Sequence, residues 1–262
     1  MATIGTGYEN VVIENKMTDL VNTKLDVNSL FTLDTSLTEA AGLRKTINKY
    51  TYTGVVEQLA KGAANTSKGS VSFVPKHYDV KRYQQTFVYN DLDIMQDPYL
   101  LDVATAGAAE VMANEIKTEY FAQLATITNT YKYTTFNYDA IVDALSEINK
   151  EVETDLFIIM GLDMRAAIRK DADYKASKQG EILYTGQFGT IAGVPCLFSK
   201  LVPAGTVYIT AKDQVKFFVK KEGSVEQNRN VETKDNTVVY DRCGVMALVD
   251  ETKSIKMIAN GK

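Results

Sequence analysis

The stretch 97-DPYLLDVATAGAAEVMANEIKTEYFAQLAT-126 decides the fold, because it is the longest uninterrupted helical pattern in the chain. Asp97 can cap its first turn, and Pro98 suits the first helical position, where a missing N–H is harmless. A helix of about 28 residues is roughly 42 Å long, more than twice the ~18 Å radius of gyration of a compact chain of this size. We call residues 97–126 the spine helix. Its predicted buried stripe consists of Leu100, Val103, Ala104, Ala108, Val111, Met112, Ile116, Tyr120, Phe121 and Leu124.

The composition is that of an ordinary globular protein. The 262 residues are 45% hydrophobic, which is enough for one large domain or two smaller ones. The net charge of −4, from 29 basic and 33 acidic residues, argues against a protein that binds nucleic acid through a basic surface. The sequence has no apolar run of membrane-spanning length and no secretory pattern in its first residues, so we expect a cytosolic protein. Cys196 and Cys243 are interpreted as buried small hydrophobes.

Two features precede the spine helix. Residues 1–43 are mixed and polar, with apolar anchors but too few for a core of their own. We therefore expect an arm that lies on another surface, for example on a neighbouring subunit. From Thr46 to Asn90, β-forming residues predict one long hairpin with a small, polar tip around Lys61 to Gly69. A hairpin of about 50 Å needs a surface to lie on; the alternative is a pair of edge strands in the protein's own sheet. The anchors of the arm are Val12, Met17, Leu20, Val21 and Phe31.

A compact mixed domain is predicted after the spine helix. A polar break at 129–135 is followed by a helix that Asn137 can cap, at 138–152. A buried strand at 156–160 and a short helix at 163–170 come next, and then an exposed loop at 172–187. Short strands complete the chain, at 190–191, 194–198, 206–209, 215–219, 237–240, 244–249 and 254–258, with a turn at 234–236.

A search for catalytic chemistry gives no site. The single histidine, His77, is interpreted as a solvated strand residue, because neither a triad nor a histidine metal site can be built around it. Asp91 and Asp93 are interpreted as a loop before the spine helix, since no further oxygen ligands follow at calcium-loop spacing. The segment 186-GQFGTIAG-193 lacks the spacing of a phosphate loop and leads into a strand. The acidic patch at 147–155 is interpreted as a solvated face. The sequence therefore predicts no enzyme, no cofactor and no metal site.

The order of these elements resembles the major capsid proteins of tailed bacteriophages, whose icosahedral head fold is shared with encapsulins. The resemblance rests on the arm, the hairpin, the spine helix, the mixed domain opened by NYDAIVDALSEI and the segment 189-GTIAGVPCLFSKLVPAGTVYI-209. That segment is similar to the family's strand, Gly-x-Pro, polar turn and Pro-x-Gly before another strand. The resemblance covers nearly the whole chain, although no single motif in it is diagnostic.

The resemblance implies an α+β fold with a long spine helix, an extended β-hairpin loop, and peripheral and axial domains. The arm is residues 1–45 and the extended loop is 46–96. The peripheral domain holds the spine helix at 97–130 and a return of its sheet at 215–243. The axial domain comprises 131–214, and its final strands are 244–262. Some members carry a helical scaffolding extension before the arm, so we expect a separate scaffold or the arm itself to control assembly.

The implied function is a structural major capsid protein that assembles as pentamers and hexamers into a phage head enclosing double-stranded DNA. The implied partners are further copies of the chain, a separate scaffold, portal and decoration proteins, and DNA bound without sequence specificity; no membrane is involved. The protein would be assembled in the host cytoplasm and located in the virion. Two alternatives remain: an encapsulin-like compartment that holds protein cargo, and a cytosolic enzyme or ligand-binding domain whose site forms only in three dimensions.

Intersubunit contacts are predicted on the extended loop and on the long sheet, because a closed shell needs many repeated contacts. Some family members form a covalent bond between a lysine of this loop and an asparagine of a neighbour. Lys61 and Lys68 are suitably placed for this, but loop-tip lysines are usually only solvated. The predicted contact residues are Lys61, Asn65, Lys68, Tyr78, Arg82, Glu226, Arg229 and Arg242.

Overall fold

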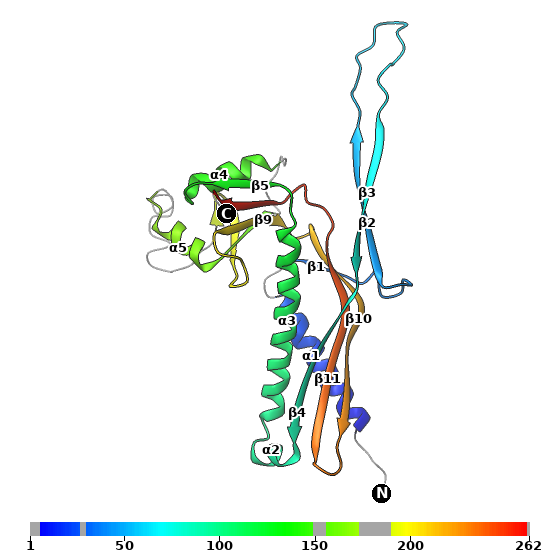
Figure 1. Cartoon of the computed structure of the whole chain (residues 1–262), viewed down its shortest axis with the longest axis vertical. Coiled ribbons are helices and arrows are strands. Elements are labelled where there is room, and N and C mark those ends of the chain that lie inside the picture. The colour runs from blue at the N-terminus through cyan, green and yellow to red at the C-terminus, as the bar shows by residue number, and fades with distance from the viewer. Residues whose placement is uncertain (1–5, 27–29, 149–155, 173–189, 261–262) are drawn as a thin grey trace.

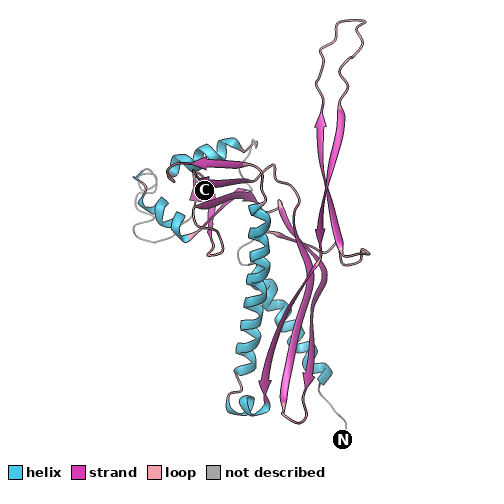
Figure 2. Ribbon diagram, in the orientation of Figure 1, coloured by secondary structure: helices cyan, strands magenta, loops and turns pink. Residues whose placement is uncertain are grey.

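The structure is a computed structural model that describes residues 6–26, 30–148, 156–172 and 190–260. It is elongated, with a β-hairpin at one end, a short helix at the opposite end and a compact domain at the side that contains the C-terminal strand (Figure 1). Helices and strands are both abundant (Figure 2), as the predicted α+β class requires. Among the described residues, none of the helices combines the length and apolar character needed to cross a bilayer.

A long four-stranded sheet forms the central body. Its order is β1 (Thr32–Asp34), β10 (Val215–Arg229), β11 (Asp235–Leu248) and β4 (Lys81–Asn90). β10 pairs with β11 in antiparallel register, and β11 pairs with β4 in the same manner. The predicted pair of strands at 237–240 and 244–249 is therefore wrong, because β11 is one strand. β10 also continues ten residues beyond the predicted end at Val219.

The hairpin is shorter than predicted. β2 (Arg44–Thr53) pairs with β3 (Ser70–Asp79) alone, as a separate two-stranded sheet. The predicted continuation to Asn90 is wrong, because the chain passes Val80 and enters β4, which lies in the body beside β11. The alternative of two edge strands in the body sheet is contradicted for β2 and β3 and correct only for β4. The sequence does not show that the pairing partner changes from β2 to β11, because β-forming residues continue without a break through 70–90.

The spine helix is confirmed as α3 (Leu100–Ala125), but it begins later than predicted. Asp97 does not cap it; its Oδ1 accepts the N–H of Tyr99 at 2.9 Å in the turn before the helix. Six of the predicted stripe residues are buried: Ala108, Met112, Ile116, Tyr120, Phe121 and Leu124. Val103 and Val111, which were predicted to widen the stripe, are exposed. The buried face is instead widened by the small residues Thr105, Ala109 and Ala113, which let neighbouring elements approach closely.

The N-terminal segment packs on its own chain. α1 (Thr6–Asp26) lies against α3 and β10, and its buried Met17, Val21 and Leu25 belong to the main core. Ion pairs flank the apolar contact, from Lys16 to Asp102 and from Lys24 to Glu110, at 2.5 and 3.1 Å. The expected surface for this part of the arm is therefore α3 and β10 of the same chain, and not a neighbouring subunit. Of the predicted anchors, Val12 is exposed.

A second core fills the compact domain at the side. Its sheet has the order β5 (Thr130–Tyr133), β12 (Ile255–Ala259), β9 (Thr206–Ala211), β6 (Leu156–Met160), β8 (Val194–Phe198) and β7 (Thr190–Ile191). The predicted polar break at 129–135 is wrong in part, because β5 forms there and pairs in parallel with β12. β6 is buried throughout, as predicted.

Two helices accompany this sheet. α4 (Tyr138–Glu147) begins after Asn137, whose side chain accepts the N–H of Ala140, so the predicted cap is confirmed. α5 (Leu162–Lys170) follows β6. The predicted end of the first helix at 148–152 and the predicted loop at 172–187 lie almost entirely outside the described residues.

A short helix replaces the loop predicted at Asp91 and Asp93. α2 (Asp91–Gln96) is started by Asn90, whose side chain accepts the N–H of Leu92, while Asp93 accepts the N–H of Asn90. Asp91 accepts bonds from Arg229 and Asn236 of the long sheet. These polar contacts attach α2 to the end of the sheet.

Candidate intersubunit surfaces

The outer half of the hairpin presents an aromatic face to solvent. Tyr50 lies opposite Phe73 and Tyr52 lies opposite Val71 across the ladder, so all four side chains share one face. The Tyr50 and Phe73 ring centroids are 6.1 Å apart, and all four side chains are at least 60% exposed. The intervening pairs put Thr51, Thr53, Ser70 and Ser72 on the opposite face. The hairpin therefore has one apolar face that its own chain does not cover.

The hairpin is also the basic part of an acidic chain. Residues 44–79 contain six lysines and arginines and two acidic residues, a net charge of +4. Because the whole chain has a charge of −4, the remaining residues together carry −8. Opposite charges on a projecting segment and on the body favour contact between the hairpin of one copy and the body of another.

The tip of the hairpin, residues 54–69, holds three of the predicted contact residues. Lys61, Asn65 and Lys68 are all exposed there. The tip is ordered by its own polar bonds: Glu57 accepts from the N–H and hydroxyl of Thr66 at 3.0 and 2.8 Å, and Asn65 Oδ1 accepts the N–H of Ser67 at 2.8 Å. The two bonds from Thr66 lower the pKa of Glu57.

The base of the hairpin is fixed to the body. Lys45 Nζ lies 4.3 Å from the centroid of the Phe218 ring, and Lys49 forms an ion pair with Glu251. Tyr78 is buried at this base, and its hydroxyl donates to the carbonyl of Leu248 at 3.0 Å. The orientation of the hairpin is therefore set within the subunit.

Two predicted contact residues lie inside the chain, which corrects their assignment. Tyr78 is held at the hairpin base as described. Arg242 is only 2% exposed; its guanidinium donates to Asn22 Oδ1 of α1 at 2.9 Å, and burial lowers its pKa. Both side chains bind their own subunit, because Tyr78 contacts the end of β11 and Arg242 contacts α1.

The other three predicted contact residues lie on the surface of the long sheet. Glu226 and Arg229 are exposed near the far end of β10, where Arg229 pairs with Asp91. Arg82 Nε lies 3.2 Å from Asp241 Oδ2. Burial alone would raise the pKa of Asp241, but the hydrogen bond from Ser224 and the charges of Lys221 and Arg82 outweigh it and lower the pKa.

The structure also shows exposed apolar residues that the sequence did not reveal as contacts. Leu92, Met95 and Tyr99, in α2 and the turn after it, are 72%, 79% and 74% exposed. We call these three residues the α2 patch. The sequence signal was weak, because a six-residue helix is too short to show a helical period.

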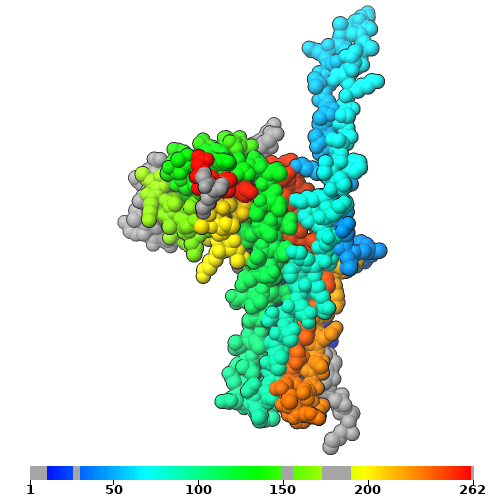
Figure 3. Space-filling view, in the orientation of Figure 1, coloured from blue at the N-terminus to red at the C-terminus, as the bar shows by residue number. Residues whose placement is uncertain are grey.

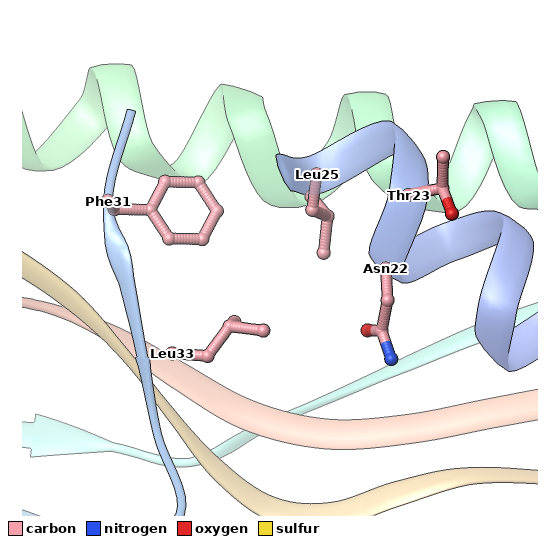
Figure 4. Close-up of a pocket in the computed structure, with 5 residues that line it drawn as sticks. All are labelled: Asn22, Thr23, Leu25, Phe31 and Leu33. Atoms are coloured by element: carbon pink, nitrogen blue, oxygen red, sulfur yellow. The ribbon is translucent and has the colours of Figure 1, made fainter. Parts of the chain in front are cut away.

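Hollows in the described surface are open grooves. One of about 400 Å³ runs between β4 and α3, lined by residues 81–85 together with Val111, Met112, Glu115 and Glu119. Another, of about 320 Å³, lies between the end of α1 and β1, where Leu25, Phe31 and Leu33 face the amide of Asn22 (Figure 4). Both grooves mix apolar side chains with a few polar ones.

His77 and the two cysteines, which could have carried catalytic or metal chemistry, lie in surroundings typical of structural residues. His77 is exposed on β3, as predicted, and its Nδ1 shares a hydrogen bond of 2.9 Å with the hydroxyl of Thr46. Cys196 is buried as expected, whereas Cys243 is only half-buried. Within the described ranges there is no group of three or more His, Cys, Asp or Glu side chains arranged to hold a metal ion.

Similarity to known proteins indicates the kind of fold to which these features belong. No protein-family model matches the chain. The chain is 23% identical over 242 residues to the major capsid protein of Staphylococcus phage phiMR11, covering 89% of this chain and 87% of that protein.

Solved structures extend the likeness to the fold. The capsid structure of the cyanophage P-SCSP1u aligns with a TM-score of 0.72 at 11% identity, covering 89% of this chain and 87% of the other. A virus-like particle from Pyrococcus furiosus aligns with a TM-score of 0.63 at 11% identity, over 95% and 99% of the two chains. These similarities confirm the predicted resemblance in fold. The chain has the major capsid fold of tailed bacteriophages.

Proposed function

We propose that this chain is a structural major capsid protein, many copies of which assemble as pentamers and hexamers into an icosahedral phage head. The observation that carries the proposal is the hairpin, which projects from the body (Figure 3). Its apolar face is left exposed by its own chain. An isolated two-stranded hairpin is only marginally stable in water, so a second surface must cover it. A further copy of the chain supplies that surface, and the relatives named above are capsid subunits.

The charge distribution supports this assignment. Lys49 at the hairpin base pairs with Glu251 of its own body, but the rest of the basic hairpin points away from that body, so it can attract the acidic surface of another copy. Such contacts are individually weak and repeat at every subunit, which suits reversible assembly of a closed shell. An acidic body also holds double-stranded DNA without binding it tightly.

Finer parts of the proposal follow from the same resemblance. We assign residues 131–214 and β12 to the axial domain, and the spine helix with β10 and β11 to the peripheral domain. Residues 244–248, which were expected in the axial domain, belong to β11 of the long sheet. The hairpin of residues 44–79 is the extended loop. We also propose that a scaffold, a portal and decoration proteins act as partners, that assembly occurs in the host cytoplasm, and that the head encloses double-stranded DNA.

Electron microscopy with light scattering on the purified protein tests the proposal. We expect uniform closed shells, or rings of five and six subunits. A monodisperse species of 29.0 kDa at every protein concentration, with or without the scaffold of the same phage, would contradict it. The contents of shells from infected cells separate a genome container from a cargo compartment: double-stranded DNA supports the phage head, and protein without nucleic acid supports the alternative.

A further inference from the structure

β4 is an edge strand that has a neighbour on one side only. It ends the order of the four-stranded sheet and pairs with β11. In an antiparallel ladder, only part of the N–H and C=O groups of a strand point toward the neighbour, and the others point away from it. Outside the ladder with β11, the described backbone contains no backbone–backbone hydrogen bond to residues 81–88. The outer edge of β4 therefore has free donors and acceptors.

The middle of this edge lacks the usual protection by charge. Residues 83–89, YQQTFVY, are uncharged and rich in β-forming side chains. The charges of β4 lie at its start, where Lys81 pairs with Glu119 at 2.6 Å and Arg82 pairs with Asp241 at 3.2 Å. A long uncharged edge strand is a template for a further strand, which makes it a site for peptide binding by strand addition.

α3 supplies an apolar wall beside this edge. β4 and α3 run in opposite directions, joined through α2 (Figure 1), and the groove of about 400 Å³ lies between them. Val103, Gly107 and Val111 follow one another at a spacing of four residues, so they share one face of α3. The two valines are 70% and 55% exposed, and a Cβ at Gly107 would meet no atom within 4 Å. This face therefore has room for apolar side chains of a ligand.

Tyr83 brings an unpaired polar group to the groove. Its side chain lines the groove and is only 7% exposed, and its hydroxyl has no hydrogen-bond partner among the described residues. Burial, and then the charges of Glu119 and Glu115, raise the pKa of Tyr83, so its hydroxyl stays neutral and can donate or accept. A buried hydroxyl without a partner is costly, and a ligand that bonds to it removes this cost.

The groove also carries a carboxylate that can bind a cation. Glu115 is exposed where it lines the groove and forms no ion pair with the described residues, whereas Glu119 is already paired with Lys81. Because Glu115 lies four residues beyond Val111, the same face of α3 changes from apolar to acidic along the groove. The complementary ligand is an extended peptide with alternating apolar side chains and a basic residue at one end.

We propose that the groove between β4 and α3 binds an extended segment of a different protein, which adds to the free edge of β4, packs apolar side chains on Val103 and Val111, and places a lysine or arginine beside Glu115. Antiparallel addition is the more stable arrangement, and it puts the basic residue at the carboxyl end of the segment. The hairpin of a further copy is not the occupant, because β2 and β3 are already paired and would bring a second strand into the same groove. The partner is thus not another copy, so the inference goes beyond the proposed function.

Synthetic peptides test the recognition of charge. The probes are TVTVTR and its acidic counterpart TVTVTE, blocked at both ends and labelled with a fluorophore, and fluorescence anisotropy measures their binding to the dilute chain. TVTVTR should bind about tenfold more tightly than TVTVTE, since one reversed charge replaces attraction by repulsion. E115K should invert this preference, whereas the control E232K, on an exposed turn, should keep it. An unchanged preference in E115K, or no binding of TVTVTR up to about 1 mM, would overturn the proposal.

Hydrogen–deuterium exchange tests the position of the bound peptide. With TVTVTR bound, the amides of residues 81–90 should exchange several-fold more slowly, because those that point away from β11 become hydrogen-bonded. TVTPTR, in which proline removes a ladder donor, should give much less protection. Protection confined to other segments would overturn the proposal. So would an E115K variant that binds both peptides as the unmodified chain does but needs a higher protein concentration to assemble, because the groove would then be a contact between copies.

Discussion

Glu251 is one of the residues that join the hairpin base to the rest of the fold. Its carboxylate accepts from Lys49 of β2 and, at 3.3 Å, from the N–H of Thr128 after α3. Burial alone would raise the pKa of Glu251, but the bonds from Lys49 and Thr128 outweigh it and lower the pKa below 4.5. A carboxylate with a lowered folded-state pKa stabilises the fold fully above its ordinary pKa and loses that contribution as the pH falls through the lowered value.

Glu251→Gln should therefore destabilise the monomer by about 1 kcal/mol at pH 7, because Lys49 loses a charged acceptor while remaining largely solvated. The difference from the unmodified chain should shrink as the pH falls from about 5 toward 3. Urea unfolding across this range measures it. Glu232→Gln, which removes an exposed carboxylate from a turn, is the matched control. An equal destabilisation by both variants would remove the special role of Glu251.

Substitution of glycine by alanine should change the stability of the protein in opposite directions at Gly223 and Gly107. A Cβ at Gly223 would lie 2.0 Å from the hydroxyl of buried Tyr240, whereas a Cβ at Gly107 in α3 meets no atom within 4 Å. Gly223→Ala should destabilise the protein by about 1–3 kcal/mol, through displacement of Tyr240. Gly107→Ala should stabilise it by about 0.5–1 kcal/mol, because alanine restricts the unfolded chain and favours helix. Thermal unfolding of the two variants tests both signs, and a stabilising Gly223→Ala would mean that β10 and β11 are less closely packed there.

At the scale of elements, α1 gives the sharpest test. Met17 is fully buried and belongs to the core formed with α3. Met17→Ala should cost about 2–5 kcal/mol in a dilute monomer, since it leaves a cavity between α1 and its own α3. Val12→Ala, at an exposed position of the same helix, should cost less than about 0.5 kcal/mol. If α1 instead binds a neighbouring subunit, Met17→Ala will leave the monomer's unfolding midpoint unchanged.

The elements that the sequence predicts well are those whose own pattern decides them. α3 has a long apolar stripe, α4 has the Asn137 cap, and β6 is a run of buried residues, so local chemistry is sufficient in each case. β3 and β4 were merged because strand-forming residues do not reveal which strand is the partner. α2 was missed because six residues are too few to show a helical period, and because Arg229 and Asn236, which help to hold it, are far away in the sequence.

At the scale of the whole molecule, burial inside the subunit decides which predicted contacts remain available. Lys61, Asn65 and Lys68 could be placed at a surface from the sequence, because a polar tip between two strands must be exposed. Tyr78 and Arg242 could not be excluded in the same way, since a tyrosine or arginine in a strand suits either an interface or an interior. Arg242 is covered by α1, and Tyr78 is covered where the hairpin base meets the end of β11, and both contacts exist only in the complete fold.

The aromatic face of the hairpin separates the stability of the subunit from the stability of the assembly. Tyr50→Ser/Phe73→Ser removes an exposed cross-strand pair that belongs to none of the buried clusters formed by the described residues. We expect the melting temperature of the monomer to stay within about 2 °C, because surface substitutions away from the core change stability little. The concentration needed for assembly should rise by about tenfold or more, because the aromatic side chains lose their burial against a second copy. The next pair along the same strands, Thr51 and Ser72, lies on the opposite face, so Thr51→Ala/Ser72→Ala is the control and should assemble as the unmodified chain does. Light scattering over a dilution series measures both variants, and equal assembly by the two would show that the aromatic face stays exposed to solvent in the shell.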